Sequence, residues 1–209
     1  MHVTAILVLF ILYIWSLYNL PVIAVGVRDL LRTSREVKKA SRSEKRKSPT
    51  FTIIIPAKDE EKVLSRLLDS LLKVNYPPQK KEIIVVEDGS VDKTVGICER
   101  YSSQFPNQLK LLLKPESNGK PSALNYALKH ATGEIIAVLD ADSVLEPDAL
   151  SRLTKHFEDQ SIAAVQGRAC SINADENMLT RLVSYEETVR YETYIRGKAI
   201  LKLFVPLTG

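Results

Sequence analysis

The chain has 209 residues, of which 45% are hydrophobic and 26% are charged, and its formal net charge is +4. This composition is typical of a folded globular protein and excludes a disordered chain. The positive charge is concentrated between Arg28 and Lys47, where nine Lys or Arg residues stand against three Asp or Glu. The rest of the chain is slightly acidic, which argues against nucleic acid as a partner. Two distant cysteines, Cys98 and Cys170, indicate neither a disulfide framework nor a zinc site.

The N-terminal segment is predicted to cross a membrane. Residues 3–27 contain no charged side chain, and as a helix they would measure about 37 Å, more than the ~30 Å of a hydrocarbon core. Pro21 is expected to kink this helix or to mark its last turns. We therefore predict a transmembrane helix over residues 1–27 and a basic juxtamembrane linker over residues 28–49. Because basic flanks stay in the cytoplasm, we expect the following domain at the cytoplasmic face of the cell membrane, beside membrane lipid.

From residue 50 onward, strand patterns alternate with helical patterns. Runs of aliphatic and β-branched residues predict strands, and apolar residues three and four positions apart predict helices. The predicted strands are residues 51–55, 82–86, 109–113, 134–139 and 162–165. The predicted helices are residues 60–74, 92–104, 121–130, 148–157 and most of 177–203. Nearly all-apolar strands separated by helices predict an α/β fold, with a mainly parallel sheet and helices on both faces.

Two aspartates, Asp140 and Asp142, directly follow the fourth predicted strand. Side chains alternate along a strand, so these two carboxylates are expected on the same side, where they repel each other. A cation such as Mg²⁺ that also carries phosphate oxygens would relieve this repulsion, although a solvated acidic turn has the same pattern. Polar clusters also follow the first two strands, at residues 56–60 and 87–90. Parallel sheets bind ligands beyond the carboxyl ends of their strands, so we expect these clusters in one crevice.

Four motifs resemble, in order and spacing, the inverting family 2 glycosyltransferases, which have the GT-A fold. They are Ile-Ile-Ile-Pro-Ala-Lys-Asp-Glu-Glu (53–61), Val-Val-Glu-Asp-Gly-Ser-Val-Asp-Lys-Thr (85–94), Asn-Gly-Lys-Pro-Ser-Ala-Leu-Asn (118–125) and Gly-Glu-Ile-Ile-Ala-Val-Leu-Asp-Ala-Asp-Ser (133–143). The resemblance covers residues 50–209 and is nearest to membrane-bound cellulose, hyaluronan and poly-N-acetylglucosamine synthases. It implies a Rossmann-like GT-A domain that transfers a sugar, with inversion, from a nucleotide-sugar donor. The donor would be linked to UDP, and the acceptor would be a polysaccharide or another carbohydrate, or a glycolipid.

The resemblance also implies roles for residues at the nucleotide. Ala57 and Glu60 match positions that contact the nucleoside, and Asp88 matches an aspartate that hydrogen-bonds the base. Lys120 matches a basic position near the donor phosphates. Simpler interpretations stay open, because Glu60 also suits a first helical turn and Lys120 also suits a solvated surface. Asp88-Gly89-Ser90 likewise suits a turn with a helix cap.

The aspartate pair acquires a more specific role from the same resemblance. Asp140 would lie near the ribose and the donor sugar, and Asp142, together with Asp140, would ligate Mg²⁺ or Mn²⁺. Such an ion stabilises the diphosphate as it leaves. We therefore interpret this pair as the metal site of the predicted donor crevice.

The sequence departs from the family pattern at several positions. Lys58-Asp59 replaces the usual Tyr-Asn, which removes an aromatic contact and leaves Lys58 to meet phosphate, and Glu87 replaces an Asp. Gln166-Gly167-Arg168 matches a stretch beside the donor sugar, although a turn after a strand is an equal interpretation.

The catalytic base is not assigned to any residue of the sequence. An inverting transfer needs a base for the acceptor hydroxyl, and the family supplies it from a Thr-Glu-Asp motif, with a later Gln-x-x-Arg-Trp motif. Neither motif occurs here, so we expect the base beyond Gly209 and interpret residues 50–209 as the donor-binding part of a longer domain. Two alternatives remain: transfer of one sugar to a polyisoprenyl phosphate or ceramide-like lipid, and a non-catalytic fragment that binds nucleotide sugars.

Overall fold

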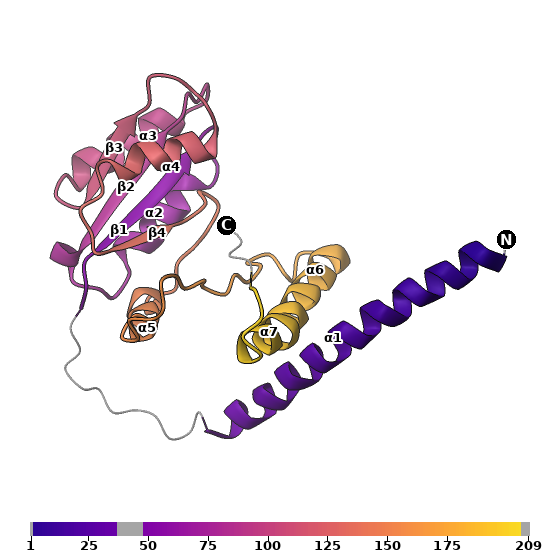
Figure 1. Cartoon of the computed structure of the whole chain (residues 1–209). Helices are drawn as coiled ribbons and strands as arrows, with labels where there is room; N and C mark the ends of the chain where they lie inside the picture. The colour runs from indigo at the N-terminus through magenta and orange to yellow at the C-terminus, as the bar shows by residue number, and fades with distance from the viewer. Residues whose placement is uncertain (1, 37–47, 206–209) are drawn as a thin grey trace. The chain divides into compact units, whose positions relative to one another are not determined.

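The computed structural model describes residues 2–36 and 48–205, which belong to two compact units (Figure 1). One unit contains residues 48–167, and the other contains the N-terminal helix and residues 168–205. Residues 37–47 of the predicted basic linker and the chain end from residue 206 lie outside the described residues.

The unit of residues 48–167 is built on a parallel sheet with strand order β3-β2-β1-β4. The strands are β1 (Phe51–Ala57), β2 (Lys81–Glu87), β3 (Leu109–Leu113) and β4 (Ile135–Val138). β1 is central, because it pairs along its whole length with β2 and over residues 51–54 with β4. The isoleucines and valines of β1 and β2 are completely buried, as expected for strands covered on both faces.

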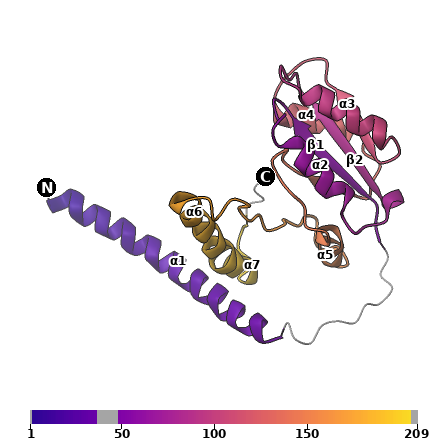
Figure 2. The same ribbon diagram turned by 180° about the vertical axis from the view of Figure 1, so that it is seen from behind.

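Helices cover both faces of this sheet (Figure 2). They are α2 (Leu64–Leu72), α3 (Thr94–Gln104), α4 (Lys120–Leu128) and α5 (Ala149–His156), with a short 3₁₀ turn η1 (Pro78–Lys80) before β2. Four leucines of α2, at helical spacing, pack with α3 and with Leu150 of α5 against one face. Two alanines of α4 pack closely against the other face. The predicted parallel α/β sheet with helices on both faces is confirmed.

Three predicted elements need correction. The strand predicted at residues 162–165 is wrong: this segment is irregular and, within the described chain, has no paired neighbour to complete a ladder. The first strand does not stop at Pro56 but continues through it to Ala57. The helix predicted from Glu60 begins only at Leu64, because the residues before it form a turn in which the Val63 N–H donates to the Glu60 carbonyl over 3.2 Å.

The other unit is entirely helical in its regular structure. It consists of α1 (His2–Glu36) and a second helical segment formed by α6 (Met178–Val189), the π-helical turn η2 (Arg190–Ile195) and α7 (Arg196–Ile200). α1 passes through Pro21 and extends nine residues beyond the predicted end at Val27. Its stretch Val3–Arg32 is long and apolar enough to cross a membrane.

α1 packs on η2 and α7 through two glycines. An added Cβ at Gly26 would lie 1.8 Å from the Thr193 carbonyl oxygen, and one at Gly197 would lie 1.9 Å from the Val22 carbonyl oxygen. Both distances are far shorter than any non-bonded contact, so a side chain at either position would push the helices apart. Small residues at such contacts let two helix backbones approach closely.

A hydrogen-bond network around Glu82 joins the amino ends of β1, β2 and β3 to the turn before β4. Its carboxylate accepts from Thr52 Oγ1 at 2.7 Å, from Lys110 Nζ at 2.5 Å, and from both the N–H and the hydroxyl of Thr132. Burial alone would raise the pKa of Glu82, but these donors outweigh it and lower the pKa to about 2. The network therefore holds the turn before β4 against the neighbouring strands.

We expect Glu82→Gln to reduce the free energy of unfolding by about 1–3 kcal/mol, the usual worth of hydrogen bonds to a charged group. Because the folded pKa lies below the ordinary value of 4.5, Glu82 stabilises the fold above about pH 4.5 and loses this contribution as the pH falls toward 2. Chemical denaturation of both proteins between pH 3 and pH 7 measures this. An equal stability difference at every pH would contradict it.

Candidate functional site

A cavity of about 300 Å³ lies beyond the carboxyl ends of β1, β2 and β4. The six predicted site residues all line it: Ala57, Glu60, Asp88, Lys120, Asp140 and Asp142. The parallel register explains this meeting, because Ala57 pairs with Glu87 at the ends of β1 and β2, and Val138 of β4 lies opposite Ile54. The structure therefore brings the three predicted polar clusters to one place.

The two aspartates after β4 project into this cavity because the residue between them is held in the core. Ala141 borders the cavity but is buried in the core on the face covered by α2 and α3, whereas Asp140 and Asp142 are exposed and line the cavity. The loop is fixed from two sides: Arg66 of α2 donates to the Asp142 carbonyl at 3.0 Å, and the Ser143 N–H donates to the Asp140 carbonyl. The alternation expected for a strand continues here past the end of β4.

The cavity concentrates negative charge. The pKa of Glu60 is raised, first by burial and then by the charges of Asp142, Asp92, Asp140 and Asp59. Lys120 partly neutralises this negative charge, since its Nζ lies 2.6 Å from Asp140 Oδ1. Both groups of this pair are well exposed, so it is easily exchanged for other partners.

Asp88 is the buried anchor of the site. Its carboxylate pairs with Lys114 Nζ at 3.0 Å and accepts from the Gly119 N–H at 3.0 Å and from Ser117 Oγ at 3.3 Å. Burial would raise the pKa of Asp88, but the Lys114 and Gly119 hydrogen bonds outweigh it and the pKa is lowered. Asp88 thus stays ionised and holds the loop from Lys114 to Gly119, which leads into α4 and Lys120.

The sequence did not reveal Lys114, because Asp88 was assigned either to the nucleotide base or to a turn with a helix cap. The one available signal was its position directly after a predicted strand, where the other site residues also stand.

The loops after β1 and β2 are joined by reciprocal hydrogen bonds. The Asp59 N–H donates to Ser90 Oγ and the Glu60 N–H to Thr94 Oγ1, while Asp59 Oδ1 accepts from the Val91 N–H. Asp59 has a left-handed backbone, with φ 56°, which Asp tolerates better than most residues. At the positions that depart from the family pattern, Glu87 accepts from the Ser90 N–H within the loop after β2, and Lys58 donates to Ser117 Oγ at 3.0 Å in the loop that leads into α4.

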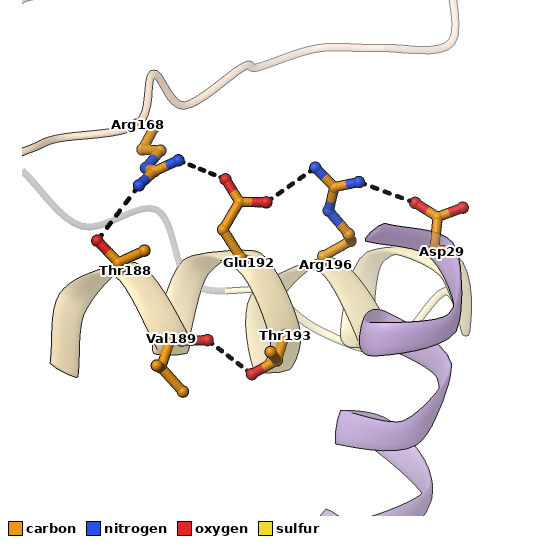
Figure 3. Close-up of polar contacts among 7 residues, drawn as sticks. All are labelled: Asp29, Arg168, Thr188, Val189, Glu192, Thr193 and Arg196. Atoms are coloured by element: carbon orange, nitrogen blue, oxygen red, sulfur yellow. Dashed lines mark hydrogen bonds and ion pairs between the residues drawn. The ribbon is translucent and has the colours of Figure 1, made fainter. Parts of the chain in front are cut away.

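The segment Gln166-Gly167-Arg168 is not among the residues that line the cavity. Arg168 belongs to the helical unit, where its guanidinium pairs with Glu192 and donates to Thr188 Oγ1 (Figure 3). A second hollow, of about 260 Å³, lies at the opposite, amino end of the strands and is lined by Glu82, Lys110 and Thr132. These side chains already bond to one another, so this hollow is a structural junction.

Comparison with known proteins now decides the family. The glycosyl transferase family 2 domain matches residues 52–206. The chain belongs to this family. The probable glycosyltransferase YdaM of Bacillus subtilis is 31% identical over 190 residues, which are 90% of this chain and 45% of that protein. The β-monoglucosyldiacylglycerol synthase of a Nostoc species is 36% identical over 135 residues, which are 64% of this chain and 29% of that protein.

A solved mannosyltransferase has a similar fold. The mannosyltransferase PcManGT from Pyrobaculum calidifontis, in complex with GDP-Man and Mn²⁺, is 30% identical, with a TM-score of 0.55 over 69% of this chain and 44% of that one. This similarity supports the GT-A-type sheet read from the sequence. The chain spans less than half the length of these relatives.

The donor set suits a hard divalent cation. Asp140 and Asp142 offer exposed carboxylate oxygens, and their charge already disfavours ionisation of Glu60. Among the described residues, no three His, Cys, Asp or Glu side chains gather closely enough to hold an ion by themselves. Mg²⁺ and Mn²⁺ sites that share a nucleotide need only one or two protein carboxylates, because phosphate oxygens complete the shell.

We expect Lys114→Met to impair this family 2 site although Lys114 itself does not line the cavity. The substitution leaves the Asp88 carboxylate buried without its cation, which costs about 3–5 kcal/mol for a buried pair. The pKa of Asp88 should then rise. Differential scanning fluorimetry at several pH values checks this, with Lys129→Met as a control that removes an exposed lysine at the end of α4. Equal melting temperatures for the Lys114 variant and the parent would contradict the assignment.

Proposed function

We propose that this chain binds a nucleoside diphosphate sugar, with Mg²⁺ or Mn²⁺, as the donor-binding part of an inverting glycosyltransferase. The observation that carries this is the convergence of Asp88, Lys120, Asp140 and Asp142 on one cavity beyond the strand ends. Membership of family 2 supports sugar transfer, and the similar mannosyltransferase in complex with GDP-Man and Mn²⁺ supports a nucleotide-sugar donor with a divalent ion.

In this proposal, different residues bind different parts of the nucleotide-sugar donor. Asp88 accepts from the base at the buried end of the cavity, beside Ala57 and Glu60. Lys120 exchanges its exposed pair with Asp140 for the donor diphosphate, which meets its positive charge. Asp142, with Asp140, holds the cation, whose charge stabilises the leaving diphosphate when it is bound.

The acceptor is proposed to be a glycolipid or a polysaccharide at the cytoplasmic face of a membrane. The β-monoglucosyldiacylglycerol synthases among the relatives favour a lipid-linked acceptor. The long apolar α1, followed by a strongly basic segment, favours a membrane anchor whose C-terminal end is cytoplasmic.

We expect Asp142→Asn to weaken Mn²⁺-dependent binding of a nucleoside diphosphate by at least about tenfold, because the loss of a charged ligand costs about 1.5–3 kcal/mol. Isothermal titration of the full chain with UDP and with GDP, each with and without Mn²⁺, measures this. The same titrations show which nucleotide base the site prefers, and we expect UDP to bind more tightly than GDP. Asp148→Asn is the matched control, because it removes an aspartate of the same unit that pairs with Arg152 outside the cavity. Unchanged binding in Asp142→Asn would refute the metal assignment.

A further inference from the structure

The helix α6 has its polar side turned to the protein and its apolar side exposed. On the polar side, Glu187 accepts from Ser171 Oγ at 2.9 Å and Thr188 accepts from Arg168 at 3.3 Å. The opposite side carries large exposed apolar residues around one exposed carboxylate, Glu186: Met178, Leu179, Leu182, Val183, Tyr185 and Val189, each more than 40% exposed. This arrangement is the reverse of a helix on the surface of a water-soluble domain, where the apolar side faces the core.

The exposed apolar surface continues past α7. Ile200, Leu201 and Leu203 are exposed, and Phe204 is 82% exposed. Monomeric soluble proteins rarely leave such a contiguous apolar patch open to water. The surface therefore requires an apolar partner.

The position of this segment on α1 identifies that partner. In addition to the contact through Gly26 and Gly197, ion pairs join the two helices. Arg196 donates to Asp29 of α1 at 3.1 Å and to Glu192 at 3.0 Å, and Glu192 also pairs with Arg168 (Figure 3). Asp29 and Gly26 both stand near the C-terminal end of the apolar stretch of α1.

The depth of this contact follows from the length of α1. A hydrocarbon core of about 30 Å takes about 20 helical residues, at about 1.5 Å each. Counted from Val3 this length ends at Val22, and counted back from Arg28, the first charged residue, it ends at Val27. The contact from Val22 to Asp29 therefore spans the C-terminal end of the apolar stretch, with Gly26 on the apolar side and the Asp29–Arg196 ion pair on the side of the water.

We propose that the α6–α7 segment is a second membrane-contacting element, whose apolar side lies in the phospholipid interface beside the C-terminal end of α1. The inference rests on the membrane anchor in the proposed function. Arg28 and Arg32 of α1 and Lys198 and Lys202 at the end of the segment suit the phosphates of that layer. The segment thereby places the end of the family 2 match, residues 178–205, at the lipid surface.

Site-specific fluorescence in vesicles of phosphatidylcholine and phosphatidylglycerol tests this. The full chain carries a single environment-sensitive label at Leu182→Cys on the apolar side of α6, at Ser184→Cys on its polar side, or at Leu12→Cys in the middle of α1. Cys170→Ser removes the exposed thiol, while Cys98 stays, because burial raises its pKa to about 12 and leaves it unreactive. The quenchers are lipids with a nitroxide near the headgroup or deep in the acyl chain, and iodide in water.

We expect deep quenching at residue 12, shallow lipid quenching at residue 182, and no lipid quenching at residue 184. Deep quenching at residue 12, together with quenching of residue 182 by iodide alone or by no quencher, overturns the inference but leaves the membrane anchor standing. If no quencher reaches residue 182, protein covers the apolar side of α6. Loss of lipid quenching at residue 12 overturns the anchor itself, and the inference with it.

A glycine pair tests how the segment is held. Gly197→Ala should reduce lipid quenching at residue 182 at least twofold, because the added Cβ meets the Val22 carbonyl. Gly167→Ala is the control, since an added Cβ there meets nothing within 4 Å. Equal quenching in both variants would contradict the role of the glycine contact.

Discussion

The register of the parallel sheet is the constraint on which the candidate site depends. β1 pairs residue for residue with β2 and over four residues with β4, so the ends of three strands open onto one cavity. A shift of β4 by one residue would turn Asp140 and Asp142 toward the core, where Ala141 is now buried. The Glu82 network fixes this register from the other end of the strands, about one strand length away. Stability and function are therefore linked through a junction that touches no ligand.

The second constraint is electrostatic. Several carboxylates face one small cavity, and burial together with the repulsion between nearby carboxylates raises the pKa of Glu60. Asp88 escapes this repulsion because Lys114 neutralises it in a buried pair. Asp140 is only partly neutralised by the exposed Lys120, and Asp142 lies in the same acidic field. The protein thus keeps its negative potential where a cation and a diphosphate are proposed to bind, and removes it where a rigid loop is needed.

The sequence predicted most of what lies near the centre of the sheet. The apolar strands, the alternation of Asp140 and Asp142 and the meeting of three polar clusters all follow from local pattern and from the rule for parallel sheets. The sequence did not predict structure that depends on a residue far away along the chain. The strand predicted at residues 162–165 finds no neighbour in the described chain, and the Asp88–Lys114 pair joins residues 26 positions apart. The contact of Gly26 with Thr193 leaves no local trace, because a glycine in an apolar helix has many uses.

The central claim is that the cavity beyond β1, β2 and β4 holds a divalent cation together with a nucleoside diphosphate. Crystals of the protein grown with Mn²⁺ and UDP, measured at the manganese absorption edge, test it most directly. The account predicts one anomalous peak beside the Asp142 carboxylate, in contact with the diphosphate, and the base near Asp88. A nucleotide bound elsewhere, such as the hollow beside Glu82, or a diphosphate bound in the cavity without manganese near Asp142, would contradict it.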